Sequence, residues 1–181
     1  MTDASTTTLI CGLACAGIAG WMLAGPASFA AAVRAFPRSA LSARVVTAVV
    51  MFWTARLLKD FPLDKWEHLK SYIPLLAVFS FAMLIYFLDE LLAPRALGGL
   101  CQLIGVPVLD AIRWSDSSLR LVLTTGVYVL IVAGMILIMS PYRFRHFFEW
   151  LHRKPGRPAA WGAGLGVYGA ALAVIALTAL G

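Results

Sequence analysis

Charge is the scarcest property of this 181-residue chain, since only 13% of its residues are Asp, Glu, Lys or Arg. A soluble domain carries about twice that share. Hydrophobic residues make up 61% of the chain, and its mean hydropathy is +0.84. Several apolar runs approach the ~20 residues that cross a bilayer as a helix, without the alternation of a membrane β-barrel. The sequence therefore predicts an all-α integral membrane protein, with residues 1–181 forming a single transmembrane domain.

Common catalytic signatures are also missing. The chain has no Gly-x-x-x-x-Gly-Lys, His-Glu-x-x-His, Cys-x-x-Cys or Gly-x-Ser-x-Gly motif. Its three cysteines, Cys11, Cys15 and Cys101, lie inside apolar runs, where we expect them to pack as small hydrophobes. His146 and His152 are six positions apart and do not share a helix face, so they do not form a metal pair. We expect no catalytic residue, cofactor or metal.

The net charge of +6 does not indicate nucleic-acid binding. Lys and Arg occupy short segments between apolar runs, as membrane topology predicts, and no nucleic-acid motif accompanies them. The first eight residues contain no Lys or Arg, so we expect residues 9–24 to be a retained first span rather than a secretory signal. This start favours an external amino terminus in a plasma (inner) membrane. The high Ala, Gly and Arg content suggests a bacterial source.

The number of spans depends on residues 96–112. The other candidate spans are residues 9–24, 45–58, 72–88, 119–139 and 159–180. Residues 96–112 are just long enough to cross but contain Gly98, Gly99, Gly105 and Pro107, so five spans or a re-entrant segment are open alternatives. Lys and Arg divide nine to six across the membrane in either case. We expect about six spans, because this avoids an apolar loop.

Two segments between spans, residues 26–44 and 140–157, are predicted to be interfacial amphipathic helices, with aromatic and aliphatic residues on one face and arginines on the other. They match without gaps at an offset of 115 residues, which places Pro26 on Pro141, Phe29 on Phe144 and Arg38 on Arg153. The shared layout predicts an internal repeat of residues 17–58 and 132–173.

Small residues recur every four positions on the first and last spans: Gly12, Ala16, Gly20, Gly162, Gly166 and Ala170. Such stripes allow helices to approach closely. They predict tight packing within the chain, in a homo-oligomer or in a larger membrane complex.

Two groups of charged residues are candidate sites. Possible intramembrane or interfacial charges are Asp89, Glu90, Arg95, Asp110 and Arg113. Ala93-Pro94 instead predicts that residues 89–95 form a turn in water. Candidate lipid-headgroup contacts are Arg143, Arg145, His146, Arg153, Lys154 and Arg157, although ordinary interface anchoring explains the same residues.

The leading functional hypothesis is a non-catalytic accessory, scaffold or homo-oligomeric membrane component, with membrane lipids as partners. One alternative is a small transporter or proton-coupled carrier that uses Asp89 or Glu90. A second alternative is a lipid-modifying enzyme that uses the basic segment 140–157.

Overall fold

Every regular element in the described part of the chain is a helix. A computed structural model describes residues 3–62, 64–87, 92–115, 117–154 and 156–178, apart from the side chains of residues 64–66. The helices are α1 (Asp3–Ala24), α2 (Pro26–Ala35), η1 (Phe36–Arg38), α3 (Ala40–Asp60), η2 (Asp64–Tyr72), α4 (Ile73–Phe87), α5 (Leu92–Ile112), α6 (Arg120–Met139), α7 (Tyr142–His152) and α8 (Gly156–Thr178). The all-α prediction is confirmed.

Six helical segments are long and apolar enough to cross a membrane: α1, α3, the end of η2 with α4, α5, α6 and α8. The fourth segment, α5, is one continuous helix of 21 residues, which spans about 30 Å at 1.5 Å per residue. The prediction of a turn at Ala93-Pro94 is wrong, because α5 begins at Leu92 and carries both residues in its first turn. Proline is tolerated there because the first helical N–H groups need no partner within the helix.

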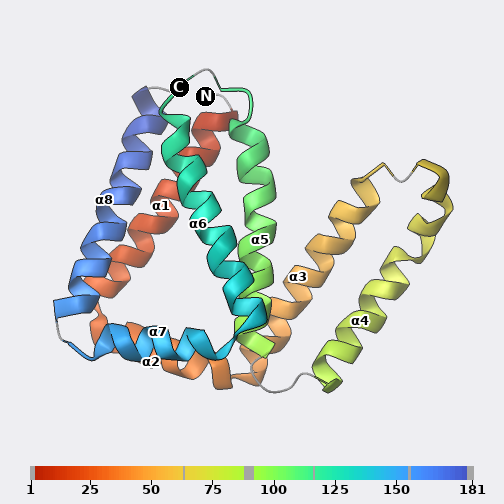
Figure 1. Cartoon of the computed structure of the whole chain (residues 1–181), viewed down its shortest axis with the longest axis horizontal. Coiled ribbons are helices and arrows are strands. Elements are labelled where there is room, and N and C mark those ends of the chain that lie inside the picture. The colour runs from red at the N-terminus through yellow and green to blue at the C-terminus, as the bar shows by residue number, and fades with distance from the viewer. Residues whose placement is uncertain (1–2, 63, 88–91, 116, 155, 179–181) are drawn as a thin grey trace.

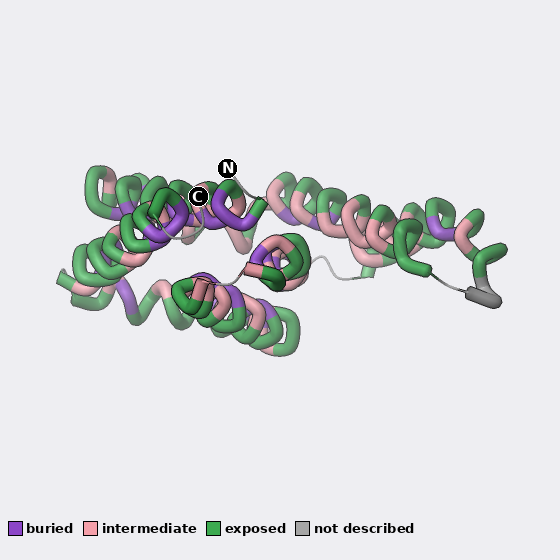
Figure 2. Tube along the Cα trace, turned by 90° about the horizontal axis from the view of Figure 1, so that it is seen from above, coloured by how far each residue is buried: buried purple, intermediate pink, exposed green. Residues whose placement is uncertain are grey.

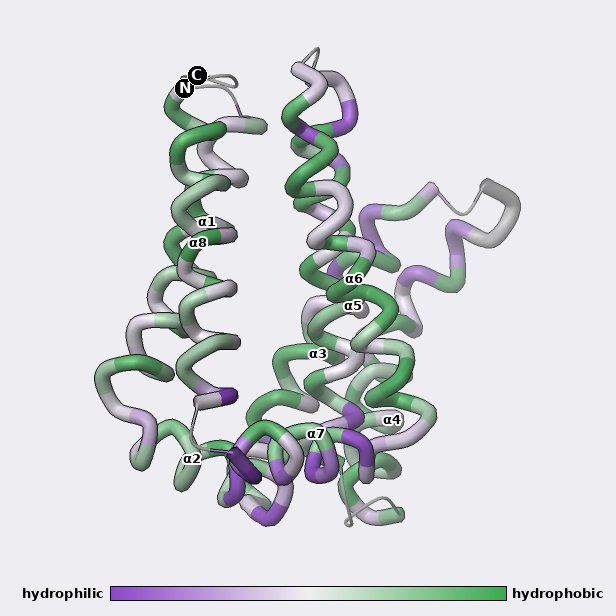
Figure 3. The backbone as a smooth tube through the Cα atoms, turned by 60° about the vertical axis from the view of Figure 1, so that its left-hand side comes forward, coloured by the Kyte–Doolittle hydropathy of each residue, from purple (hydrophilic) through white to green (hydrophobic). Residues whose placement is uncertain are grey.

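The spans form two groups that meet near the chain termini. α1 and α8 lie side by side, and α5 packs between α3 and α6, with α4 outermost against α3 (Figure 1). Figure 3 shows the α1–α8 pair set apart from the other spans along most of its length. Near the termini, the buried side chains of Ala4, Val108, Leu123 and Leu172 join α1, α5, α6 and α8 in one apolar cluster.

The opposite end, which we call the base, is crossed by α2 and α7 (Figure 1). The two helices run antiparallel. The ring centroids of Phe29 and Phe148 are 6.2 Å apart, and those of Phe36 and Phe144 are 5.6 Å apart. Leu151 packs with Phe29 and with Met22 of α1. Hydrophilic residues collect at the base, whereas the spans are mostly hydrophobic (Figure 3). Both predicted amphipathic segments therefore contain a helix that crosses the ends of the spans, although residues 40–44 of the first segment belong to α3 and residues 156–157 of the second belong to α8.

The order span, crossing helix, span occurs twice. Subtracting 115 from the bounds of α6, α7 and α8 gives residues 5–24, 27–37 and 41–63, which closely match α1, α2 with η1, and α3. Both units begin at the terminal end and cross the base. The common origin of residues 17–58 and 132–173 stays a prediction.

Candidate functional site

A groove between α2 and α7 is the candidate site. Its volume is about 580 Å³, and the helices that line it cross the base of the molecule. From α2 and η1 it is lined by Ala30, Val33, Arg34, Pro37 and Arg38. From α7 and the residue that follows it, it is lined by Phe144, Arg145, Phe148, Glu149, His152 and Arg153.

The two walls of the groove use equivalent positions. Adding 115 to positions 30, 33, 34, 37 and 38 gives 145, 148, 149, 152 and 153, all of which line the opposite wall. The helices are antiparallel, so the equivalence describes an approximate two-fold relation about the middle of the groove. The packing beneath follows the same relation, because Phe36 contacts Phe144 and the equivalent Leu151 packs with Phe29.

Spacings of three and four residues place the apolar and charged lining positions on adjoining parts of each helix surface. Val33 and Phe148 occupy equivalent positions and pack against the buried cluster of Met22, Phe29 and Leu151. That cluster holds α2 against α7. The groove therefore combines an apolar wall with exposed cationic side chains, an arrangement suited to an amphipathic anion.

Cations outnumber anions in the lining by four to one: Arg34, Arg38, Arg145 and Arg153 against Glu149. Arg145 Nε lies 2.9 Å from Glu149 Oε1, and both side chains are more than half exposed. Water weakens such a pair, so it adds little to stability but removes one net charge locally. Among the described residues, Arg34, Arg38 and Arg153 form no ion pair and stay available to a ligand.

His152 adds a further polar group to the lining. Its Nδ1 lies 2.8 Å from the Phe148 carbonyl oxygen. A carbonyl oxygen can only accept, so Nδ1 carries the proton and donates this bond. The other ring nitrogen, Nε2, is buried and has no hydrogen-bond partner in the described part of the chain. With the proton on Nδ1, Nε2 is a hydrogen-bond acceptor.

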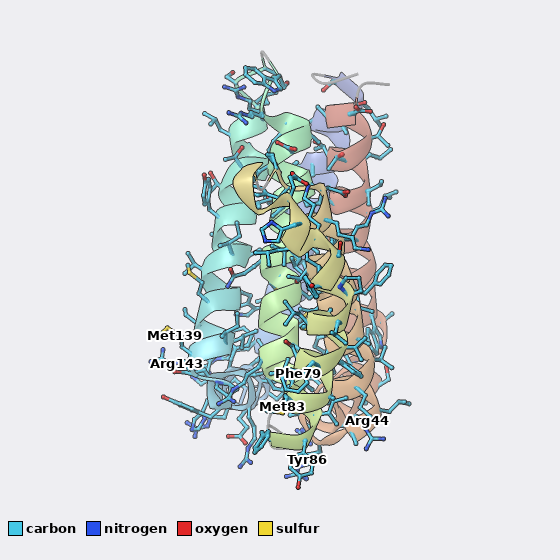
Figure 4. The ribbon with its side chains drawn as sticks, turned by 90° about the vertical axis from the view of Figure 1, so that its right-hand side faces the viewer. Arg44, Phe79, Met83, Tyr86, Met139 and Arg143 are labelled. Carbon is cyan, nitrogen blue, oxygen red and sulfur yellow. The ribbon has the colours of Figure 1, made fainter. Side chains whose placement is uncertain are left out.

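The structure divides the predicted lipid-contact residues. Arg145 and Arg153 line the groove, whereas Arg143, His146 and Lys154 are exposed outside it. Arg143 projects from the same end of the molecule as Arg44 (Figure 4).

Arg157 has a different role, because it anchors the start of α8 to α7. Its Nη1 donates to the Trp150 carbonyl oxygen at 3.0 Å, and its guanidinium carbon lies 4.3 Å from the centroid of that tryptophan ring. A guanidinium over an aromatic face is attracted to the ring quadrupole.

Arg34 and Arg38 line the groove opposite α7, and the sequence did not predict that they share a site with residues of that helix. Their helix was predicted, with its arginines toward lipid headgroups, but its partner was not. The internal match at an offset of 115 residues pointed to this pairing, because it aligns Arg38 with Arg153. A repeated amphipathic helix whose two copies pair brings equivalent residues to one groove.

The predicted intramembrane charges do not form one site. Asp89 and Glu90 lie outside the described residues. Arg95 lies in the first turn of α5, toward the base, and its Nε is buried with no hydrogen-bond partner among the described residues. Asp110 is exposed at the other end of α5, about 22 Å along the helix axis from Arg95. Beyond it, Arg113 lies with its guanidinium carbon 5.1 Å from the Trp114 ring centroid.

Fold and groove together define a polytopic helical membrane protein with a cationic cleft at one end of its spans. No family model, curated protein or solved structure matches the chain. Within the described ranges, no three His, Cys, Asp or Glu side chains gather as a metal ion would require.

Proposed function

We propose that the protein is a non-catalytic membrane component that binds anionic phospholipid headgroups in the groove between α2 and α7. The main support for this proposal is that four arginines line the groove beside Val33 and Phe148. Arginine guanidinium groups bind phosphate oxygens through paired, charge-assisted hydrogen bonds. Basic pockets at membrane-spanning helices recognise anionic headgroups in this way.

The groove side is proposed to face the cytoplasm across a bacterial plasma (inner) membrane. With six spans, nine Lys and Arg residues fall on the groove side and six on the other side. Cytoplasmic segments carry the excess of Lys and Arg, and the cytoplasmic leaflet carries anionic lipid. Both trends support this orientation.

Charge removal inside and outside the groove tests the proposal. The triple variant Arg34→Gln, Arg38→Gln, Arg153→Gln should weaken phosphatidylglycerol binding about 100-fold. Each arginine contributes roughly 1 kcal/mol, which is about five-fold in affinity. Binding is measured by titration of a fluorescent anionic lipid into the purified protein.

The matched control removes three charges from the same end of the molecule. Arg44, Arg143 and Lys154 do not line the groove, and each is replaced by glutamine. This variant should bind almost as the unchanged protein does. Equal losses in the two triple variants would mean that general surface charge, not the groove, attracts the lipid.

Assembly with other membrane chains is a second candidate role, favoured by α4. Only 6% of the apolar window that contains this helix is buried, the smallest share among the six spans, and exposed residues predominate on most helices (Figure 2). Phe79, Met83 and Tyr86 project from this helix (Figure 4), and all three are exposed. We expect purification in a gentle detergent to yield a complex of fixed stoichiometry, either with a second protein or with further copies of the chain. A monomer at every protein concentration would contradict this role.

A further inference from the structure

We infer that the ligand of the groove carries two phosphates, and that it is a lipid of the diphosphatidylglycerol class. This inference rests on the proposed function and specifies which anionic headgroup the groove prefers. A soluble diphosphate would share with this lipid the feature that the groove is inferred to recognise, which is two phosphates on a short linker.

The first argument is the separation of the free cations. Phe29 contacts Phe148 and Phe36 contacts Phe144, so residue numbers rise along α2 as they fall along α7. Arg38 therefore lies at one end of the groove and Arg153 at the other. Counted from Phe29 and Phe148, nine and five residues separate the two backbones by about 21 Å, and counted from Phe36 and Phe144, two and nine residues separate them by about 17 Å. Two phosphates span this separation without requiring both side chains to extend fully toward one anion.

The second argument is the composition of each end. One end contains Arg38, with Arg34 one helical turn nearer the middle on the same wall. The other end contains Arg153 beside His152, whose buried Nε2 lacks a hydrogen-bond partner among the described residues. With the proton on Nδ1, this nitrogen is a hydrogen-bond acceptor and suits a hydroxyl group rather than a phosphate oxygen. Each end thus offers to one phosphate a guanidinium that forms no ion pair within the described ranges.

The third argument is the surface between the two ends of the groove. Arg145 is paired with Glu149 at 2.9 Å, and the two-fold relation places Glu149 as close to the middle as its equivalent, Arg34. The apolar surface beside the pair comes from Val33 and Phe148. A ligand with a phosphate at each end and an uncharged linker places its charges at Arg38 and Arg153 and its linker on this apolar surface. Arg38 and Arg153 are the equivalent residues of the two units, so the two-fold relation of the protein matches the two-fold relation of the lipid.

The experiment compares two lipids at equal total phosphate. The full chain is placed in neutral phosphatidylcholine nanodiscs that contain either diphosphatidylglycerol or twice as many phosphatidylglycerol molecules. We expect diphosphatidylglycerol to bind about ten-fold more tightly or better, because its second phosphate binds at a high effective concentration. Arg38→Gln and Arg153→Gln should each abolish this preference, whereas Arg143→Gln should preserve it.

The outcomes separate this inference from the proposed function. Equal affinity for the two lipids would overturn the inference and leave general anionic-lipid binding in place. Binding of neither lipid would overturn both. In a third experiment, inorganic pyrophosphate alone is added to the protein in neutral nanodiscs. Tight pyrophosphate binding that diphosphatidylglycerol does not displace would overturn the lipid assignment. Arg38 and Arg153 are exposed, so their replacement should leave folding intact, which thermal unfolding checks.

Discussion

Replacing Gly12 or Gly169 by valine should lower the free energy of unfolding by about 3 kcal/mol, because it forces α1 away from α8. A Cβ atom on Gly12 would lie 2.8 Å from the Gly169 carbonyl oxygen and 3.0 Å from the Ala173 nitrogen. A Cβ on Gly169 would lie 2.7 Å from the Gly12 oxygen and 2.9 Å from the Ala16 nitrogen. These neighbours are backbone atoms, so no side chain can turn aside to relieve the contact. Unfolding in detergent, followed by circular dichroism, measures the loss.

Glycines on the same two helices provide the control. A Cβ on Gly17 of α1 or on Gly164 of α8 meets no atom within 4 Å. Valine at either position should change the free energy of unfolding by less than about 0.5 kcal/mol. If all four variants lose the same stability, the close α1–α8 approach does not determine the effect, because valine has a higher helix propensity than glycine.

This crossing also shows how far small-residue spacing predicts packing. Gly12 and Gly162 of the predicted stripes do meet the opposite helix. Gly20 instead faces open space, and Ala170 is exposed. A strict four-residue repeat advances 400° around a helix and drifts about 40° at each step. Contacts along a helix crossing therefore alternate between spacings of three and four residues. The sequence alone does not show in which order these spacings occur.

The glycines of α5 were ambiguous for a related reason. In the sequence, Gly98 and Pro107 within one apolar run are compatible with a broken, re-entrant segment. In the structure, a Cβ on Gly98 would lie 2.6 Å from the Gly134 carbonyl oxygen of α6. This glycine therefore permits close packing of two spans rather than breaking a helix. Only the neighbouring helix distinguishes these two uses of glycine.

The groove was the least predictable feature. Run length and hydropathy predict six spans, and the spacing of aromatic residues predicts both crossing helices. Neither property says that the two crossing helices lie against each other. Arg34 and Arg153 are 119 positions apart in the sequence and share a site only because α2 and α7 pair. That pairing depends on tertiary contacts such as Phe29 with Phe148.

Replacing Leu151 by alanine should lower the free energy of unfolding by about 3 kcal/mol and reduce lipid binding in the groove. Leu151 is only 1% exposed, and it packs with Met22 and Phe29, so it joins α7 to α1 and α2. Its loss leaves a cavity beneath the wall that contains Phe148. We expect the preference for diphosphatidylglycerol to fall together with the stability, in the same unfolding and lipid titrations, because Arg38 and Arg153 lose their fixed separation.

Two further replacements separate packing at the base from general loss of apolar surface. Leu177 of α8 is 65% exposed, so its replacement by alanine should leave both stability and lipid preference nearly unchanged. Phe36 is the equivalent of Leu151 in the other unit and contacts Phe144, so Phe36→Ala should reproduce both losses. If Leu151→Ala and Phe36→Ala reduce stability but preserve the lipid preference, the ends of the groove are positioned by the spans and not by the pairing of α2 with α7.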